Sequence, residues 1–404
     1  MSQTRNHHKT KIVVATAVLL LIAVSYVYAE KKFGTVVYEF KKSEPIASSN
    51  VEPVKEVPKH IATPNAVKSI YMSACAASSN SFRESLVSLA DTTEVNAIVI
   101  DVKDFSGTIS FDSGLAGDAG TGCRVPDMKE FLEFLRTKNI YRIARITVFQ
   151  DPFYSKKHPE LAVKKNSNRA TIWADHKGIN FIDVGAKPYW DYVVDLARAS
   201  HEIGFDEINF DYVRFPSDGN MNDIFFEHSN DVLVANPVLG KAIALEKFFK
   251  YLHEKMTESK IVTSADLFGM VTTNYDDLNI GQVLERALPY FDYVAPMVYP
   301  SHYPPNFNGW KNPNTVPYEL IHFVMGSAVK RAEALKSATT TPAEVAERLS
   351  VEQLRPWIQD FDYGGNYDVA EVKAQIRASY DVGLDSWMLW APSNKYTKGA
   401  LVAE

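Results

Sequence analysis

The segment GFDEINFDYVRFP, which begins at Gly204, carries the strongest signal for chemistry in this chain. Its alternation of polar and apolar residues predicts a β-strand whose side chains point alternately to two faces. One face would carry Asn209, Asp211 and Val213, and the other would carry Ile208, Phe210 and Tyr212. A carboxylate at the end of such a strand can act as a nucleophile or as an acid–base group, and we expect this role for Asp211. The alternative is a structural aspartate paired with Arg214 or Arg145, a pairing that is compatible with catalysis because buried charges need partners.

A second carboxyl group is needed if the reaction is the hydrolysis of a glycosidic bond. One carboxyl group then donates a proton, and the other attacks the sugar or activates a water molecule. The segment SADLFG places Asp266 near the end of the next apolar run, where it would meet Asp211 if the two runs are neighbouring strands. We therefore assign Asp266 as the acid–base residue, although an aspartate at a strand end is also a common cap. Four other carboxylates stand at comparable positions: Asp101, Asp104, Asp151 and Asp360.

Aromatic and polar side chains gather at the ends of the apolar runs and in the loops that follow them. Flat apolar rings with a polar rim suit the C–H faces of sugars, although any single ring could equally belong to the core. The aromatic residues are Tyr71, Phe149, Tyr212, Phe268, Tyr299 and Trp390, with Tyr154, Trp173 and Trp310 in the loops. The polar residues are Asp101, Lys103, Arg145, Asn209, Arg214, Ser301, Gln359 and Asp360. Together they predict a groove that binds a carbohydrate, with or without cleaving it.

Eight short apolar runs supply the elements that would position these residues. Segments with helical periodicity separate most of the runs, which is the pattern of a parallel sheet. The runs begin at Lys68, Asn96, Tyr141, Asp206, Lys260, Phe291, Leu354 and Asp385. Eight such units predict a single α/β domain with a (β/α)8 barrel fold, in which residues 317–350 form two helices. Elongated loops follow the second, third, fourth and sixth strands, on the face where barrel enzymes build their sites.

The residues before the barrel differ from it in composition. Positively charged residues precede an uncharged run from Ile12 to Ala29, which is long enough to span a membrane. We favour a retained signal-anchor over a cleaved signal peptide, and the positive flank predicts an extracytoplasmic body. The protein would then be a single-pass protein of the cell membrane, or a secreted one if the signal is cleaved. Residues 30–62 are polar and interrupted by prolines, as in a disordered linker, so residues 63–404 would form the barrel.

Charge and cysteine content restrict the partners of the chain. A net charge of -6 and a pI near 6.0 argue against a nucleic-acid partner. The two cysteines, Cys75 and Cys123, would form a disulfide in an oxidising compartment, or else remain two buried thiols. The histidines after His7 and His8 show no HxH or HExxH arrangement. The expected chemistry demands neither a metal nor an organic cofactor, and the sequence leaves the oligomeric state open.

Four motifs in combination resemble a bacterial family of glycoside hydrolase domains that is otherwise of unknown function. They are GFDEINFDYVRFPSDG, DVKDFSG at Asp101, RITVFQDP at Arg145 and YVAPMVYPSHY at Tyr293. The resemblance covers residues from about 64 to 400. The similarity of this family to alpha-amylase-like barrels implies a barrel fold and a carboxylate-driven hydrolysis of glycosidic bonds. It also implies a nucleophile at the end of the fourth strand, which matches Asp211, and an acid–base residue on a later strand, for which Asp266 is a candidate.

The same segment resembles the DxxDxDxE signature of chitinases. The four fixed positions of that signature fall on Asp206, Asn209, Asp211 and Val213. Because the catalytic glutamate of the signature falls on Val213, the substrate-assisted mechanism of chitinases is not supported.

The resulting hypothesis is an enzyme that hydrolyses an O-glycosidic bond in an extracellular or cell-wall polysaccharide. Asp211 would be the nucleophile or an ion-pair stabiliser, kept ionised by a partner such as Arg145. Asp266 would be the proton donor, with a pKa raised by desolvation. Two rival hypotheses are a surface barrel that binds glycan without cleaving it and a cell-envelope scaffold that binds a protein.

Overall fold

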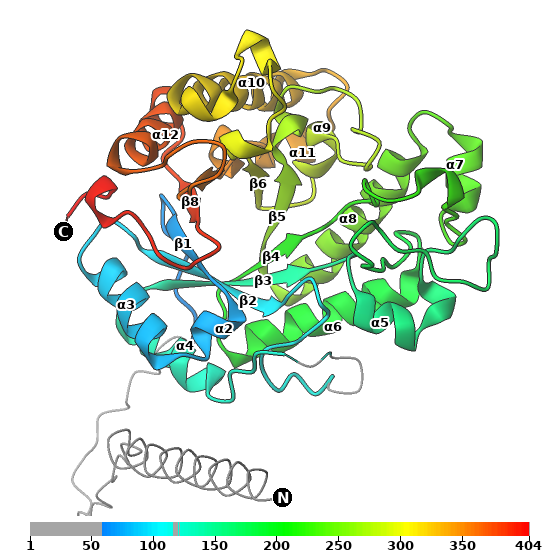
Figure 1. Cartoon of the computed structure of the whole chain (residues 1–404), viewed down its shortest axis with the longest axis horizontal. Coiled ribbons are helices and arrows are strands. Elements are labelled where there is room, and N and C mark those ends of the chain that lie inside the picture. The colour runs from blue at the N-terminus through cyan, green and yellow to red at the C-terminus, as the bar shows by residue number, and fades with distance from the viewer. Residues whose placement is uncertain (1–58, 116–119, 121, 404) are drawn as a thin grey trace, which may run out of the picture. The chain divides into compact units, whose positions relative to one another are not determined.

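Eight parallel strands close into a barrel in the computed structural model, which describes residues 59–115, 120 and 122–403 (Figure 1). Each strand pairs with the next in sequence, and β8 returns to pair with β1. The strands are β1 (Lys68–Met72), β2 (Ala97–Lys103), β3 (Tyr141–Thr147), β4 (Glu207–Asp211), β5 (Val262–Phe268), β6 (Tyr293–Met297), β7 (Trp357–Gln359) and β8 (Trp387–Trp390). The predicted (β/α)8 barrel is confirmed.

Helices cover the outside of the barrel (Figure 1). Each longer helix buries one apolar stripe, as its sequence period requires. For example, α6 has Pro188 in its first turn and ends at Ile203, where it is capped by Gly204, whose φ of 126° suits glycine. The helices are α2 (Ala74–Ala77), α3 (Asn80–Asp91), α4 (Met128–Thr137), α5 (Pro152–Lys157), α6 (Lys187–Ile203), α7 (Asn230–Ala235), α8 (Gly240–Ser259), α9 (Leu284–Ala287), α10 (Pro317–Ser337), α11 (Ala343–Arg348) and α12 (Val369–Asp381). The two helices expected between the sixth and seventh strands are α10 and α11.

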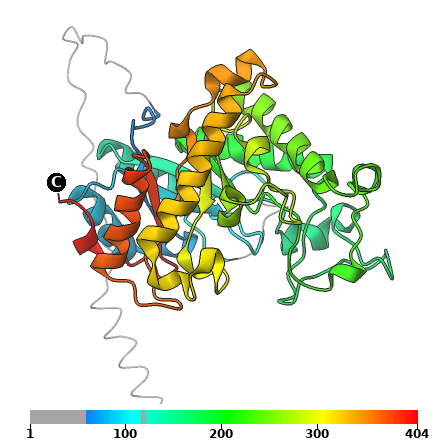
Figure 2. The same ribbon diagram turned by 90° about the horizontal axis from the view of Figure 1, so that it is seen from above.

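Long loops follow β2, β3, β4 and β6, as predicted. The loops after β3 and β4 contact each other through a bridge between Lys164 and Phe225. They form the green lobe beside the barrel in Figure 2, where α10 and α12 lie next to each other on another side. The face of the barrel at the C-terminal ends of the strands is therefore built mainly by these long loops.

The interior of the barrel is partly polar. Residues that point outward, such as Ile98 and Ile100 of β2, join the apolar core under the helices, whereas Val99 between them joins the interior cluster. Near the start of β4, the fully buried Glu207 accepts two hydrogen bonds from Arg355 Nη1, at 2.9 and 3.0 Å. Charged side chains inside the barrel are thus paired, as their burial demands.

The end of β4 differs from the alternation that the sequence predicts. The strand stops at Asp211, and Tyr212 has a left-handed φ of 52°. The backbone turn reverses the expected faces, so Val213 is buried in the outer core and Tyr212 lines the mouth of the barrel. The expectation that Val213 shares the face of Asp211 is wrong, because period-two alternation holds only while the backbone stays extended.

The described chain begins in contact with the barrel. The ring of His60 stacks on His201 of α6 at 3.9 Å, and the amide of Ile61 donates to Asp206 at 2.8 Å. These two residues, which the sequence assigned to the linker, therefore contact the barrel. The expected membrane segment at residues 12–29 lies outside the described residues, and among the described residues no helix is long and apolar enough to cross a membrane.

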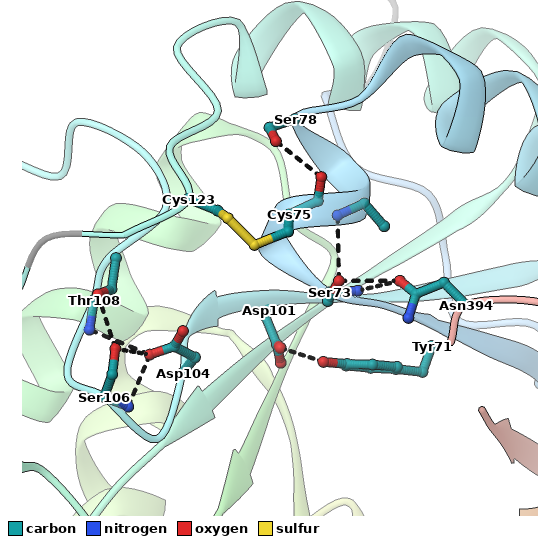
Figure 3. Close-up of a disulfide and its surroundings, with 11 residues drawn as sticks. Tyr71, Ser73, Cys75, Ser78, Asp101, Asp104, Ser106, Thr108, Cys123 and Asn394 are labelled. Atoms are coloured by element: carbon teal, nitrogen blue, oxygen red, sulfur yellow. Dashed lines mark hydrogen bonds between the residues drawn. A yellow bond between two sulfur atoms is a disulfide. The ribbon is translucent and has the colours of Figure 1, made fainter. Parts of the chain in front are cut away.

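A disulfide joins Cys75 of α2 to Cys123 in the loop after β2 (Figure 3). The Cα atoms are 5.0 Å apart, across a sequence separation of 48 residues. Of the two states that the sequence allowed, the structure has the disulfide. It joins the helix that follows β1 to the loop that follows β2.

Candidate active site

The guanidinium group of Arg145 on β3 lies at the centre of the mouth of the barrel. Its Nη1 donates to Asp101 of β2 at 2.6 Å, and its Nη2 donates to Asp211 of β4. Its Nε lies 3.7 Å from Oδ2 of Asp266 on β5. One arginine thus brings together carboxylates from the three strands β2, β4 and β5. In the barrel, β2 and β4 flank β3, and β5 lies next to β4.

The carboxyl group of Asp266 is buried in the barrel. Its Oδ1 accepts hydrogen bonds from the amide of Asn209 at 2.8 Å and from the indole N–H of Trp357 at 2.7 Å. Burial, followed by the charge of Asp211, raises the pKa of Asp266 to about 8, although Arg145 and the two hydrogen bonds oppose this shift. A carboxyl group of this kind carries a proton at pH 7 and can donate it.

Asp211 has a different environment from Asp266. One oxygen is paired with Arg145, and the other accepts the backbone N–H of Tyr212 at 2.5 Å. That bond depends on the left-handed conformation of Tyr212, which is uncommon for a residue with a bulky side chain. Backbone strain of this kind is tolerated where the surrounding structure enforces it, and it is concentrated at functional sites.

Asp101 connects the ion pairs to the aromatic wall of the mouth. It accepts a hydrogen bond from the hydroxyl of Tyr71 (Figure 3), whose ring stacks on Trp390 with 4.0 Å between centroids. Burial raises the pKa of Asp101, and the pairing with Arg145 opposes this shift. The Arg145 guanidinium carbon lies 5.2 Å from the centroid of the Trp390 ring, so aromatic packing also orients the arginine.

A cavity of about 250 Å³ opens at these residues. It combines two carboxyl groups with aromatic rings, as carbohydrate sites do. Its lining consists of Arg145, Asp211, Tyr212, Arg214, Asp266, Phe268, Gln282, Met297, Tyr299, His302, Trp357 and Trp390. Both carboxyl groups proposed from the sequence therefore face one cavity.

Residues 69–396 match the family described as "Putative glycosyl hydrolase domain". The chain belongs to this family. The match spans the barrel from β1 to the loop after β8, so this glycosyl hydrolase domain includes every residue of the cavity.

Solved structures are similar to the chain, and the first of those named here shares its fold. The glycoside hydrolase domain of PgaB (BpsB) from Bordetella bronchiseptica is 12% identical, with a TM-score of 0.58 over 83% of this chain and 99% of that chain. A hypothetical protein from Ruminiclostridium thermocellum ATCC 27405 is 28% identical, with a TM-score of 0.41 over 49% of this chain and 96% of that chain. No curated protein matches the chain.

Some residues expected to contact substrate lie directly behind the cavity lining, whereas six of them line the cavity of this glycosyl hydrolase domain: Arg145, Tyr212, Arg214, Phe268, Tyr299 and Trp390. Tyr71 and Asp101 hold Trp390 and Arg145, and Asn209 holds Asp266. These three residues are not among the residues that line the cavity, but they position side chains that line it.

Three residues expected to bind substrate are engaged elsewhere. The ammonium group of Lys103 is buried against Asp151, at 2.8 Å. Gln359 accepts a hydrogen bond from the backbone of Ser301, and Asp360 accepts the amide and hydroxyl of Thr397 at 2.8 and 2.6 Å. These residues do lie at strand ends, as predicted, but their polar groups bond to other residues of the protein.

The remaining candidates from the sequence have structural surroundings. Asp104 accepts the amide and hydroxyl of Ser106 in a turn (Figure 3), and Asp151 caps α5. The loop and strand-end aromatics Phe149, Tyr154, Trp173 and Trp310 belong to the core or are packed against it. For these four rings the core interpretation is the one that the structure supports.

Four cavity residues were not among the expected substrate contacts: Gln282, Met297, His302 and Trp357. Gln282 accepts the backbone N–H of Phe268 and donates to the carbonyl of Val213, so it links two cavity segments at 2.8 and 3.1 Å. It comes from the loop after β5, where no pattern in the sequence marks it. Met297 ends β6 and His302 follows that strand, so the C-terminal end of a strand was the available signal for both, whereas Trp357 begins β7 and had no such signal.

Proposed function

We propose that this protein hydrolyses an O-glycosidic bond in an extracellular or cell-wall polysaccharide. The observation that carries the proposal is the unequal environment of two carboxyl groups in one cavity. Asp266 is buried with a pKa of about 8, and Asp211 is paired with Arg145. Such a difference separates a proton donor from an ionised carboxylate.

In this mechanism the two carboxyl groups act on opposite parts of the scissile bond. Asp266 donates its proton to the oxygen of the leaving sugar, and Asp211 stabilises the positive charge that develops at the sugar ring or attacks it. Water then bonds to the anomeric carbon and gives a proton back to Asp266, which releases the second sugar product and restores both carboxyl groups. Arg145 pairs with Asp211, while Asn209 and Trp357 hold Asp266 in place. Trp390 and Tyr299 provide apolar faces against which a sugar ring can stack.

We also propose that residues 12–29 anchor the protein in the membrane and that residues from about 30 connect this anchor to an extracytoplasmic barrel. The disulfide between Cys75 and Cys123 supports this location, because such bonds persist in oxidising compartments and are rare in the cytosol. Protease treatment of intact cells that express the protein tests the orientation, since only an extracytoplasmic barrel would be degraded.

The enzymatic proposal is tested with purified protein and a panel of cell-wall and storage polysaccharides. We expect the wild type to release new reducing ends, and we expect Asp211→Asn and Asp266→Asn each to lower kcat/KM by several orders of magnitude. The exposed Asp385 provides a matched control, because Asp385→Asn makes the same chemical change on the surface. Binding of glycan without release, unchanged by either cavity substitution, would show a glycan-binding barrel and refute the catalytic assignment.

A further inference from the structure

Arg214 is a cavity cation with unused hydrogen-bonding capacity. Its Nη1 donates to the carbonyl of Phe215 at 3.0 Å and to the hydroxyl of Ser217 at 3.3 Å. Its Nε and Nη2 have no hydrogen-bond partner among the described residues, and no described carboxylate lies within 4.0 Å of the guanidinium. The side chain lines the same cavity as Asp211 and Asp266.

The other basic side chains of the cavity lack this capacity. Arg145 is committed to Asp101 and Asp211. Burial lowers the pKa of His302 below its usual value of 6.5, so this imidazole is neutral at pH 7. A positive charge that is free to meet a ligand is therefore found at Arg214.

Packing holds the Arg214 side chain in place without neutralising it. The guanidinium carbon lies 5.3 Å from the centroid of the Tyr212 ring and 5.8 Å from that of the Phe181 ring. Burial lowers the pKa of Arg214, which means that the protein surroundings disfavour its charge. A ligand that supplies an opposite charge would relieve this cost, and a guanidinium with two free N–H positions can bind an oxyanion with two parallel hydrogen bonds.

We propose that Arg214 binds an oxyanion on the sugar, a carboxylate or a sulfate, so that the substrate is an acidic polysaccharide. This inference rests on the proposed function, because it specifies the substrate of the same cavity.

The carboxyl groups of the cavity do not prevent an anion from binding. Asp266 is protonated at pH 7, because its pKa is raised to about 8. Arg145 pairs with both Asp101 and Asp211, so its single positive charge is shared between two carboxylates. The charges of Asp211, Asp175 and Asp218 act on Arg214 from a distance, but none of these carboxylates pairs with it directly, so a negatively charged sugar group can take that place.

The experiment measures binding by isothermal titration calorimetry with the purified full chain carrying Asp266→Asn, which prevents turnover and mimics the protonated carboxyl group. The probes are oligosaccharides of polygalacturonate, alginate and hyaluronan beside their carboxyl-reduced forms, and chondroitin sulfate beside its desulfated form. The variants are Arg214→Gln, Arg214→Lys and, as a surface control on α12, Arg377→Gln, whose side chain is exposed.

We expect at least one acidic probe to bind more tightly than its neutralised form, and Arg214→Gln to weaken only the acidic member, by about 10- to 100-fold. Arg214→Lys should recover part of this loss because it keeps the charge but not the paired geometry, and Arg377→Gln should change nothing. The pair that shows the preference identifies carboxylate or sulfate as the recognised group. A purely structural role for Arg214 would lower the affinity for both members of a pair equally.

Two results separate this inference from the proposed function. If the wild type releases reducing ends from a neutral polysaccharide and Arg214→Gln cleaves it equally well, the hydrolase stands and the inference is wrong. If no polysaccharide is cleaved but acidic probes still depend on Arg214 for binding, the inference stands and the hydrolase is wrong. Equal binding of acidic and neutralised probes throughout the panel would also overturn the inference.

Discussion

The indole N–H of Trp357 on β7 donates a hydrogen bond of 2.7 Å to the carboxyl group of Asp266 on β5. Because β6 lies between these two strands, the contact crosses the interior of the barrel. Asn209 of β4 donates to the same oxygen from the other side. Three strands thus fix the orientation of one carboxyl group, and the closed barrel is what brings these strands around it.

The first prediction concerns the pH dependence of hydrolysis. Burial raises the pKa of Asp266 from 3.8 to about 8, so the group is protonated below that pH and ionised above it. A proton donor works only in its protonated form, so kcat/KM should fall about tenfold for each pH unit above 8. The measurement is kcat/KM for the wild type between about pH 5 and 10. A rate that rises through pH 8 would contradict the role of Asp266 as donor.

The second prediction concerns the effect of Trp357 on the alkaline limb of this profile, which is the fall of kcat/KM above about pH 8. The indole hydrogen bond stabilises the ionised form of Asp266 and lowers its pKa. Trp357→Phe removes this bond while keeping an aromatic ring, so the alkaline limb should shift upward by about one pH unit. The pH profile of kcat/KM checks the shift. Trp390→Phe is the matched control, because Trp390 also lines the cavity but donates no hydrogen bond to Asp266, and it should leave the limb where it is.

The sequence predicts the barrel well because the barrel depends on local patterns. Apolar runs separated by helical segments define eight strands, and the C-terminal ends of parallel strands must meet at one face. That rule alone places Asp211 and Asp266 together. Their partner Arg145 follows from the same rule, since it stands beside Asp101 and Asn209 in the register of neighbouring strands.

The remaining features depend on contacts that a local pattern does not contain. The turn at Tyr212 is stabilised by the side chain of Asp211 and cannot be read from alternation. Asp360 looks equivalent to Asp266 at a strand end, but its partner Thr397 lies in the segment after β8. The bond from Trp357 to Asp266 joins residues 91 positions apart. Which polar strand-end groups stay free for substrate is therefore decided by loops and by distant strands.

The third prediction concerns the disulfide. The bond between Cys75 and Cys123 closes a sequence separation of 48 residues, which in the chain-entropy description stabilises the fold by about 4 kcal/mol. The double variant with both cysteines changed to serine should show a lower urea midpoint than the wild type. Reductant should lower the midpoint of the wild type but not that of the double variant. Equal midpoints for wild type and double variant would show that the bond does not stabilise the folded protein.

The fourth prediction separates a structural aspartate from the catalytic ones within the same sequence segment. Asp206 occupies the first position of the chitinase-like signature, but it lies just before β4, at the opposite end of the strand from Asp211. There it accepts hydrogen bonds from the backbone N–H and the Nε of the buried Arg142, at 2.9 and 2.8 Å. Asp206→Asn leaves the arginine charge buried without its partner and should lower the free energy of unfolding by about 3–5 kcal/mol.

The measurement for Asp206 is urea denaturation together with kcat/KM at a temperature where the variant stays folded. We expect lower stability and unchanged kcat/KM, which is the reverse of the pattern expected for Asp211→Asn. Arg142→Met combined with Asp206→Asn should recover part of the lost stability, because no charge then remains unpaired at this site. A large loss of kcat/KM in folded Asp206→Asn would mean that the signature marks a functional residue here, and that the ion pair with Arg142 acts on the mouth of the barrel through β4.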